Sequence, residues 1–327
     1  MEGVLSGPRL AFLGAGDIAG YHAKAARHAG FDLAAIASRK GSDRAIAFAK
    51  EHSFGHVYNS PQELLSSDWD ALLVCTSVET AFQYAIAAVE SERPTLLEKP
   101  VAMKSSDLLG ILDGDTSNIV VGYNRRHYSS VAAAKRFFDE SENVLVTLEV
   151  PESVDLMTEE KRLGREQVMG NSVHALDLLR YIVGPVTLVH RQHKPYRFSP
   201  SGSVLLAESA RGDQIVIKAA WNSPSNFSIS LESEGRRFAL SPFEIGKLYE
   251  GMQVDEPSKE RPIRTYSPKL IQEFPVTSMA TSLKPGFGEQ MLDFLKFTET
   301  GKKSRALAEL KDAHEALVLA EALIESW

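Results

Sequence analysis

The sequence predicts an α/β protein of two domains. The first, residues 1–122, is a doubly wound parallel sheet, and the second, residues 123–327, is an α/β domain with an open, mainly antiparallel sheet. The chain has 327 residues, which is too long for one average domain. Its hydrophobic fraction of 43% is enough to form a substantial core. Short apolar runs alternate with amphipathic segments in the first third, and longer alternating strands follow Tyr123.

Six short strands are expected in the N-terminal domain, with helical segments between nearly every pair. Crossovers of that length require neighbouring strands to run parallel. Ser42 and the Ser60–Pro61 pair are typical helix starts, whereas Gly30 and Gly114 are typical stops or turns. The predicted strands are 9–14, 31–38, 56–58, 70–76, 94–98 and 118–123.

The C-terminal domain is expected to combine an antiparallel sheet, solvated on one face, with three helices. Turn sequences stand at 211–213 and 233–236. One helix begins near Asn171 or Ser172 and ends at Gly184–Pro185, and two more cover 288–301 and 309–326. The predicted strands are 144–150, 186–193, 203–209, 214–221 and 227–233.

Composition and charge argue for small-molecule chemistry. The formal net charge of −7 argues against nucleic acid or an anionic membrane as a partner. A single cysteine, Cys75, cannot form an intrachain disulfide, and no Cys/His spacing suggests a metal site. No apolar run approaches the ~20 residues that cross a bilayer, and no targeting signal is visible, so a cytoplasmic location is expected.

A glycine-rich motif follows the first strand directly and opens a helix. Gly14 permits a tight turn, Gly16 permits backbone to approach a pyrophosphate, and Ala19 permits close packing of helix on sheet. The intervening Asp17 and Ile18 belong to the same loop, where the helix N-terminus offers amide donors to an anion. This context favours a dinucleotide site over a glycine turn without a ligand.

The end of the second strand indicates which dinucleotide is used. An NAD site usually places an acidic residue here, whereas this chain has Ser38, Arg39 and Lys40. A hydroxyl with two cations suits a ribose 2′-phosphate, so NADP is favoured over NAD. The alternative is a solvated turn with two ordinary surface charges.

Several segments together resemble the Gfo/Idh/MocA oxidoreductase family, named for glucose–fructose oxidoreductase and inositol dehydrogenase. The resemblance spans nearly the whole chain and rests on the order and spacing of its motifs. These are GAGDIA at 14–19, Glu98–Lys99–Pro100, GYNRRH at 122–127, HALDLLRYIVG at 174–184 and the closing KDAHEALVLAEALIES.

The resemblance implies a Rossmann domain followed by a domain whose open antiparallel sheet covers the nicotinamide, with substrate in the cleft between them. Glu98 and Lys99 follow the fifth strand, and Lys99 is expected to contact both cofactor and substrate. The Lys99–Pro100 bond is often cis in the family. Thr76 and Ser77 take the family's Thr–Pro positions near the nicotinamide, and Ala81 replaces a histidine.

The family's active-site helix carries an aspartate, a histidine four residues later and a second aspartate three residues beyond. His174 and Asp177 match the last two, whereas Gly170 replaces the first. On a helix His174 and Asp177 share one face. The alternative is a structural His–Asp pair in the core.

The expected mechanism uses His174 as acid and base, Lys99 as electrostatic and orienting group, and Asp177 as partner of substrate or imidazole. Asn171, at the start of the same helix, is a further expected substrate contact. Tyr123 and Arg126 are expected to contact substrate, although an interdomain hydrogen-bonding role for Arg126 is equally compatible. The polar loop 157–170 is a candidate substrate lid.

The sequence therefore predicts an NAD(P)-dependent oxidoreductase that transfers hydride to or from a carbinol or carbonyl carbon of a sugar, polyol or nucleotide-sugar. Two alternatives from the same family remain: a glycosidase that uses bound NAD, and a non-catalytic dinucleotide-binding sensor. The resemblance also implies self-association, as a homodimer or homotetramer.

Overall fold

The computed structural model describes residues 7–39, 41–153, 165–193 and 202–325. The chain divides into two compact units. The first contains residues 1–127 and 278–321, and the second contains residues 128–277 and 322–327. The predicted C-terminal domain comprises all residues after 122, whereas residues 278–321 group with the N-terminal unit in the structure. The functions expected of the two domains stay predictions.

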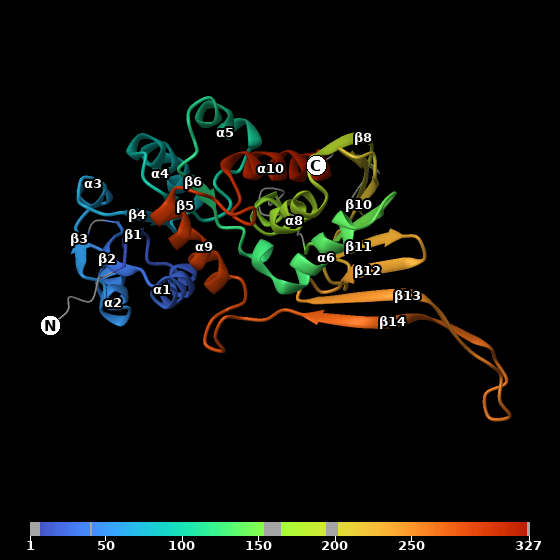
Figure 1. Cartoon of the computed structure of the whole chain (residues 1–327). Coiled ribbons are helices and arrows are strands. Elements are labelled where there is room, and N and C mark those ends of the chain that lie inside the picture. The colour runs from blue at the N-terminus through green and yellow to red at the C-terminus, as the bar shows by residue number, and fades with distance from the viewer. Residues whose placement is uncertain (1–6, 40, 154–164, 194–201, 326–327) are drawn as a thin grey trace. The chain divides into compact units, whose positions relative to one another are not determined.

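The first unit is built on a six-stranded sheet in the order β3-β2-β1-β4-β5-β6 (Figure 1). All five neighbouring pairs are parallel, as the helical crossovers predict. The strand order reverses between β1 and β4, which is where open α/β sheets place ligands. The strands are β1 (Arg9–Leu13), β2 (Asp32–Ala37), β3 (His56–Tyr58), β4 (Ala71–Val74), β5 (Thr95–Leu97) and β6 (Ile119–Val121).

Helices connect these strands, and local sequence sets several of their ends. Ser42 and Ser60 accept hydrogen bonds from the amides of Ala45 and Glu63, so both are side-chain N-caps, as predicted. Gly30 ends α1 at a φ of 114°, the left-handed conformation that glycine tolerates. The helices are α1 (Asp17–Ala29), α2 (Asp43–Glu51), α3 (Pro61–Leu65), α4 (Val78–Ser91) and α5 (Ser105–Leu112).

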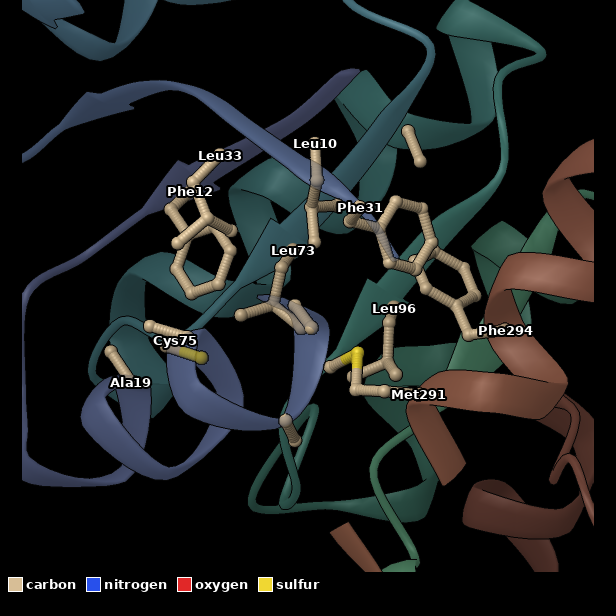
Figure 2. Packing of buried hydrophobic residues seen from close by; sticks show 14 of the residues in the cluster. Leu10, Phe12, Ala19, Phe31, Leu33, Leu73, Cys75, Leu96, Met291 and Phe294 are labelled. Atoms are coloured by element: carbon tan, nitrogen blue, oxygen red, sulfur yellow. The ribbon is translucent and has the colours of Figure 1, made fainter. Parts of the chain in front are cut away.

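The two C-terminal helices, α9 (Phe287–Thr300) and α10 (Leu310–Ile324), explain why the first unit includes late residues. Helix α9 packs on α1 and places Met291 and Phe294 in the same apolar cluster as the strands β1, β4 and β5 (Figure 2). The rings of Phe31 and Phe294 lie 5.7 Å apart. Each fully buried side chain of this size stabilises the fold by about 1.5–3 kcal/mol. Helix α9 therefore completes the N-terminal core.

The second unit is an eight-stranded sheet in the order β14-β13-β12-β11-β7-β10-β9-β8. Every neighbouring pair is antiparallel except β7 and β10, which run parallel. The predicted mainly antiparallel sheet is thereby confirmed. The strands are β7 (Leu145–Val150), β8 (Val186–His193), β9 (Gly202–Ser209), β10 (Gln214–Ala220), β11 (Ser228–Ser233), β12 (Arg236–Leu240), β13 (Ile245–Asp255) and β14 (Thr265–Pro275).

Strands β12 to β14 were absent from the predicted set of strands. Figure 1 shows β13 and β14 continuing as a two-stranded ribbon beyond the other strands of their sheet. Most of this ribbon is exposed, so its sequence lacks the alternation of apolar and polar residues that marks a half-buried strand.

Two helices of the second unit pack together, and the later one carries His174 and Asp177. They are α6 (Ser129–Asp139) and α8 (Val173–Val183). Helix α8 ends before Gly184, whose φ is 84°, in agreement with the predicted stop. Among the described residues, none of the helices has the length and apolarity needed to span a bilayer.

Candidate functional site

The turn after β1 has room only for glycine. Gly14 has a φ of 101°, and its amide donates to the carbonyl of Ala37 at 2.9 Å. A Cβ at this position would lie 2.3 Å from the carbonyl oxygen of Cys75. Because no real side chain tolerates that distance, glycine lets the ends of β1, β2 and β4 meet closely.

Gly16 has the opposite surroundings. It caps α1 with an ordinary φ of −79°, and a Cβ there would meet nothing within 4 Å. The space beside it is open, and the first amides of α1 have no carbonyl four residues earlier within the helix, although the Ala19 amide donates to the carbonyl of Gly16 at 3.1 Å. Ala19 is fully buried one turn later, as close packing of helix on sheet requires. This is a suitable cradle for a pyrophosphate.

A cavity of about 680 Å³ opens at this edge of the sheet, entirely within the first unit. It lies against the carboxyl ends of β1, β2 and β4, where the doubly wound fold binds dinucleotides. Its walls are formed by Leu13, Gly14, Ala15, Gly16, Ala37, Ser38, Arg39, Ser42, Arg44, Pro61, Gln62, Cys75, Thr76, Ser77, Thr80 and Tyr84.

Six predicted cofactor residues are thereby brought together around one cavity: Gly14, Gly16, Ser38, Arg39, Thr76 and Ser77. Of the other predicted cofactor residues, Asp17, Ile18 and Ala19 form the first turn of α1, and Glu98 and Lys99 follow β5. Lys40 lies outside the described residues.

The other ten wall residues were not predicted to contact the cofactor, and two of them, Arg44 and Tyr84, carry ionisable side chains of interest. Arg44, on α2, forms an ion pair with Asp17 with 2.5 Å between Nη2 and Oδ1. Burial raises the pKa of the Tyr84 phenol, which keeps its hydroxyl protonated as a hydrogen-bond donor. Both residues lie on helices well after the glycine motif, and the predicted helix start at Ser42 was the only local indication for Arg44.

Lys99 stands where β5 ends beside the wall of the cavity. The amide of Glu98 donates to the carbonyl of Val74 at 2.9 Å, so this segment borders the end of β4. The Lys99–Pro100 bond is cis, as the resemblance implied. Burial lowers the pKa of the Lys99 ammonium, the Glu98 carboxylate raises it, and the charges of Arg125 and Lys284 lower it further.

Glu98 has a buried partner, His22, which the sequence does not predict. The Nε2 of His22, on α1, lies 2.5 Å from Oε1 of Glu98. The other carboxylate oxygen accepts from the Lys99 amide at 3.1 Å. The only sequence indication is the position of His22, in the second turn of α1 on the face of Ala19.

His174 and Asp177 lie in the second unit, in the first turns of α8, and are 6% and 1% exposed. A π-helical turn, Val168–Ser172, precedes them; such turns are frequent at functional sites. A Cβ added at Gly170 within this turn would meet nothing within 4 Å. His174 and Asp177 therefore lie three residues apart in one helix, which places both side chains on the same helix face.

A second buried carboxylate, Glu152, lies beside this helix start and was also not predicted. Its Oε2 accepts from Nδ2 of Asn171 at 2.9 Å and from Oγ of Ser172 at 2.8 Å. Asn171, expected to bind substrate, is exposed and held by this contact. No local sequence pattern indicates the contacts of Glu152 with Asn171 and Ser172, because about twenty residues separate them along the chain.

The remaining predicted residues differ in their surroundings. Tyr123 and Arg126 are buried in the first unit, and Arg126 pairs with Asp312 of α10 at 3.2 Å. Arg126 thus has an internal structural partner, and its contact with substrate stays a prediction. Most of the proposed lid 157–170 lies outside the described residues. No three His, Cys, Asp or Glu side chains in the described part of the chain are grouped to hold a metal ion.

Comparison with known proteins identifies relatives of this chain. Residues 9–113 match the family model GFO_IDH_MocA, described as an oxidoreductase family with an NAD-binding Rossmann fold. Inositol 2-dehydrogenase 2 of Saccharopolyspora erythraea is 23% identical over 64% of this chain and 66% of its own length. The inositol 2-dehydrogenase of Paracoccus denitrificans is 23% identical over 77% of this chain and 81% of its own length.

The fold is also shared with solved structures. A levoglucosan dehydrogenase in complex with NADH and levoglucosan superposes with a TM-score of 0.73 at 17% identity, over 98% of this chain and 96% of the other. This likeness confirms the predicted α/β class with its parallel and mainly antiparallel sheets. With the family match over residues 9–113, these relatives support the predicted resemblance to the Gfo/Idh/MocA family of NAD-binding oxidoreductases.

Proposed function

We propose that the chain catalyses NAD(P)-dependent oxidoreduction at the CH–OH or carbonyl carbon of a sugar, polyol or nucleotide-sugar. The supporting observation is the cavity at the strand ends. Gly14 and Gly16 line this cavity, and the segment that carries Lys99 runs beside the end of β4 at its border. The relatives named above include inositol 2-dehydrogenases, which act on a polyol, and a levoglucosan dehydrogenase seen with NADH.

The cradle fits a dinucleotide because the helix N-terminus and the open space at Gly16 suit its pyrophosphate. When bound, the nicotinamide accepts or returns the hydride that the substrate carbon exchanges. The residues of the chain must then bind the hydroxyl, orient it and move its proton. Those tasks determine the roles proposed for Lys99, His174 and Asp177.

In the oxidation direction, the substrate hydroxyl must lose its proton as the C–H bond breaks and the C=O bond forms. We propose that His174 accepts this proton, because a free imidazole has a pKa of ~6.5 and can therefore exchange protons near neutral pH. Lys99 keeps its ammonium beside the oxygen and stabilises the developing negative charge. Asp177 orients the imidazole or binds a further hydroxyl of the substrate.

For the cofactor we propose NADP or NAD, with NADP favoured. Ser38, Arg39 and Arg44 line the cavity where β2 ends, the region that distinguishes a ribose 2′-hydroxyl from a 2′-phosphate. Guanidinium groups bind phosphate oxygens in a bidentate manner. Asp17 pairs with Arg44, which leaves Arg39 as the arginine to test.

We also propose a cytoplasmic location, in which the single cysteine, Cys75, stays a buried free thiol.

Replacement of Lys99 or His174 by alanine should lower kcat by about 10²-fold or more, because each change removes electrostatic or acid–base help from the transition state. Affinity for the cofactor should be largely kept. Initial rates at 340 nm with a panel of sugars and polyols measure the first effect, and nucleotide titration measures the second. Full activity in either variant would contradict the assigned roles.

Matched controls are Lys104→Ala and His190→Ala, both at exposed positions, which should leave kcat unchanged. The same panel separates the proposed function from its alternatives. Release of a glycoside product without a net change at 340 nm would indicate a hydrolase, and nucleotide binding without either reaction would indicate a sensor.

Arg39→Ala should raise KM for NADP about 10-fold and leave KM for NAD nearly unchanged, since a charge-assisted hydrogen bond to the 2′-phosphate is worth about 1.5–3 kcal/mol. Arg136→Ala, at an exposed position of the second unit, is the control. Equal effects of Arg39→Ala on both cofactors would show that the side chain does not contact the 2′-phosphate.

We further propose that the chain forms a homodimer or homotetramer. Large apolar side chains are exposed along the β13–β14 ribbon, and contiguous apolar surface is often an interaction site. They include Met252, Val254, Tyr266, Leu270 and Ile271. Sedimentation should give two or four times the mass of the chain, and Ile271→Glu should shift the equilibrium to smaller species. A monomer at micromolar concentration would overturn this proposal.

A further inference from the structure

A continuous hydrogen-bonded path joins the cofactor-binding helix to Lys99. His22 lies on α1, whose N-terminus forms the cradle, and is fully buried. Its Nε2 contacts Oε1 of Glu98 at 2.5 Å, and Oε2 of Glu98 accepts from the Lys99 amide at 3.1 Å. Since a carboxylate can only accept, the shared proton is assigned to Nε2 of His22.

The surroundings of Glu98 are adapted to hold a carboxylate. A Cβ on Gly122, the residue after β6, would lie 2.8 Å from Oε1 of Glu98. Because Gly122 has no side chain, the Glu98 carboxylate can lie next to the backbone at this position. Glu98 is only 8% exposed, and a buried carboxylate is costly unless paired and hydrogen-bonded. The packing of the sheet alone does not require a carboxylate there, since apolar residues of similar volume commonly replace buried ion pairs without loss of stability.

The other side of the histidine ring is apolar. The ring of His22 lies 4.8 Å from that of Phe287, on α9. Within the described residues, no hydrogen-bonding partner lies near Nδ1 of His22. The polar contact of this buried side chain is thus directed to Glu98 alone, which makes His22 a dedicated donor to that carboxylate.

The charge of Glu98 acts on two neighbouring groups. It raises the pKa of the Cys75 thiol, second to the effect of burial, and Cys75 lines the cofactor cavity. It also opposes the burial and the charges of Arg125 and Lys284, all of which lower the pKa of Lys99. Of the groups that shift the pKa of Lys99, Glu98 is therefore the one that favours its ammonium form.

We propose that His22 is a positioning residue, which holds the side chain of Glu98 in place so that Glu98 orients the backbone of Lys99 and keeps its carboxylate beside that residue. The proposal rests on the catalytic role proposed above for Lys99. It adds that one buried side chain, that of His22, fixes the position of Lys99 relative to α1, the helix proposed above to bind the cofactor.

The test measures Lys99 directly, without turnover. The full chain is labelled with acetic anhydride across a pH series, and the rate of acetylation at Lys99 is followed by peptide mass spectrometry. Replacing His22 with leucine removes the contact that holds the Glu98 carboxylate in place, so the carboxylate should move away from Lys99 and the pH midpoint for Lys99 should fall by about one unit. His22→Gln, which retains an N–H donor, should restore most of the difference. His28→Leu, exposed on the same helix, is the control.

Glu98→Gln removes the charge itself and should lower the midpoint by at least as much. If His22 acts through Glu98, the double variant should resemble Glu98→Gln alone, because the two changes break one path. An unchanged midpoint in Glu98→Gln would overturn the proposal even if His22→Leu fails to fold. Additive shifts in the double variant would also overturn it.

Turnover then separates this inference from the proposed function. In an active enzyme, His22→Leu should lower kcat about 10-fold, shift the pH profile and change KM for the cofactor little. If the wild-type chain oxidises no polyol, the proposed function fails, while the labelling experiment still decides the role of His22.

Discussion

The absence of a side chain at Gly14 is the constraint on which the site depends. A Cβ there would lie 2.3 Å from the carbonyl oxygen of Cys75, so the end of β1 approaches the end of β4 only because this residue is glycine. That approach places the N-terminus of α1 over the edge of the sheet and forms the cavity between it, β2 and β4. Gly14 serves this geometry, whereas Gly16 leaves the space open for a ligand.

Each unit has a buried, hydrogen-bonded glutamate close to residues with proposed catalytic roles, in addition to the buried Asp177 of the second unit. Glu98 is held by His22 and contacts the amide of Lys99, and Glu152 is held by Asn171 and Ser172 at the start of the helix that carries His174. Buried carboxylates are costly and are kept where they are hydrogen-bonded. Their positions suggest that the chain maintains these charges for orientation and electrostatics.

Local patterns predicted most of the fold and part of the site. The six parallel strands, the Gly14 turn and the helix ending at Gly184 follow from periodicity and from the conformations that glycine tolerates. The exposed ribbon of β13 and β14 was missed because strands without a buried face lack alternation. His22, Glu152 and Arg44 were missed because their contacts join residues far apart in the chain. The grouping of α9 with the first unit was missed for the same reason, since it depends on packing against α1.

Titration of the chain with NADPH tests the central claim most directly, with Gly16→Asp as the informative variant. Aspartate is a good helix N-cap, and a Cβ at this position meets nothing, so stability should stay within about 0.5 kcal/mol of wild type. Its charge would face the pyrophosphate, so affinity should fall by about 10²-fold or more, and by less in Gly16→Asn. Unchanged affinity in Gly16→Asp would contradict the account, because the dinucleotide would then bind elsewhere.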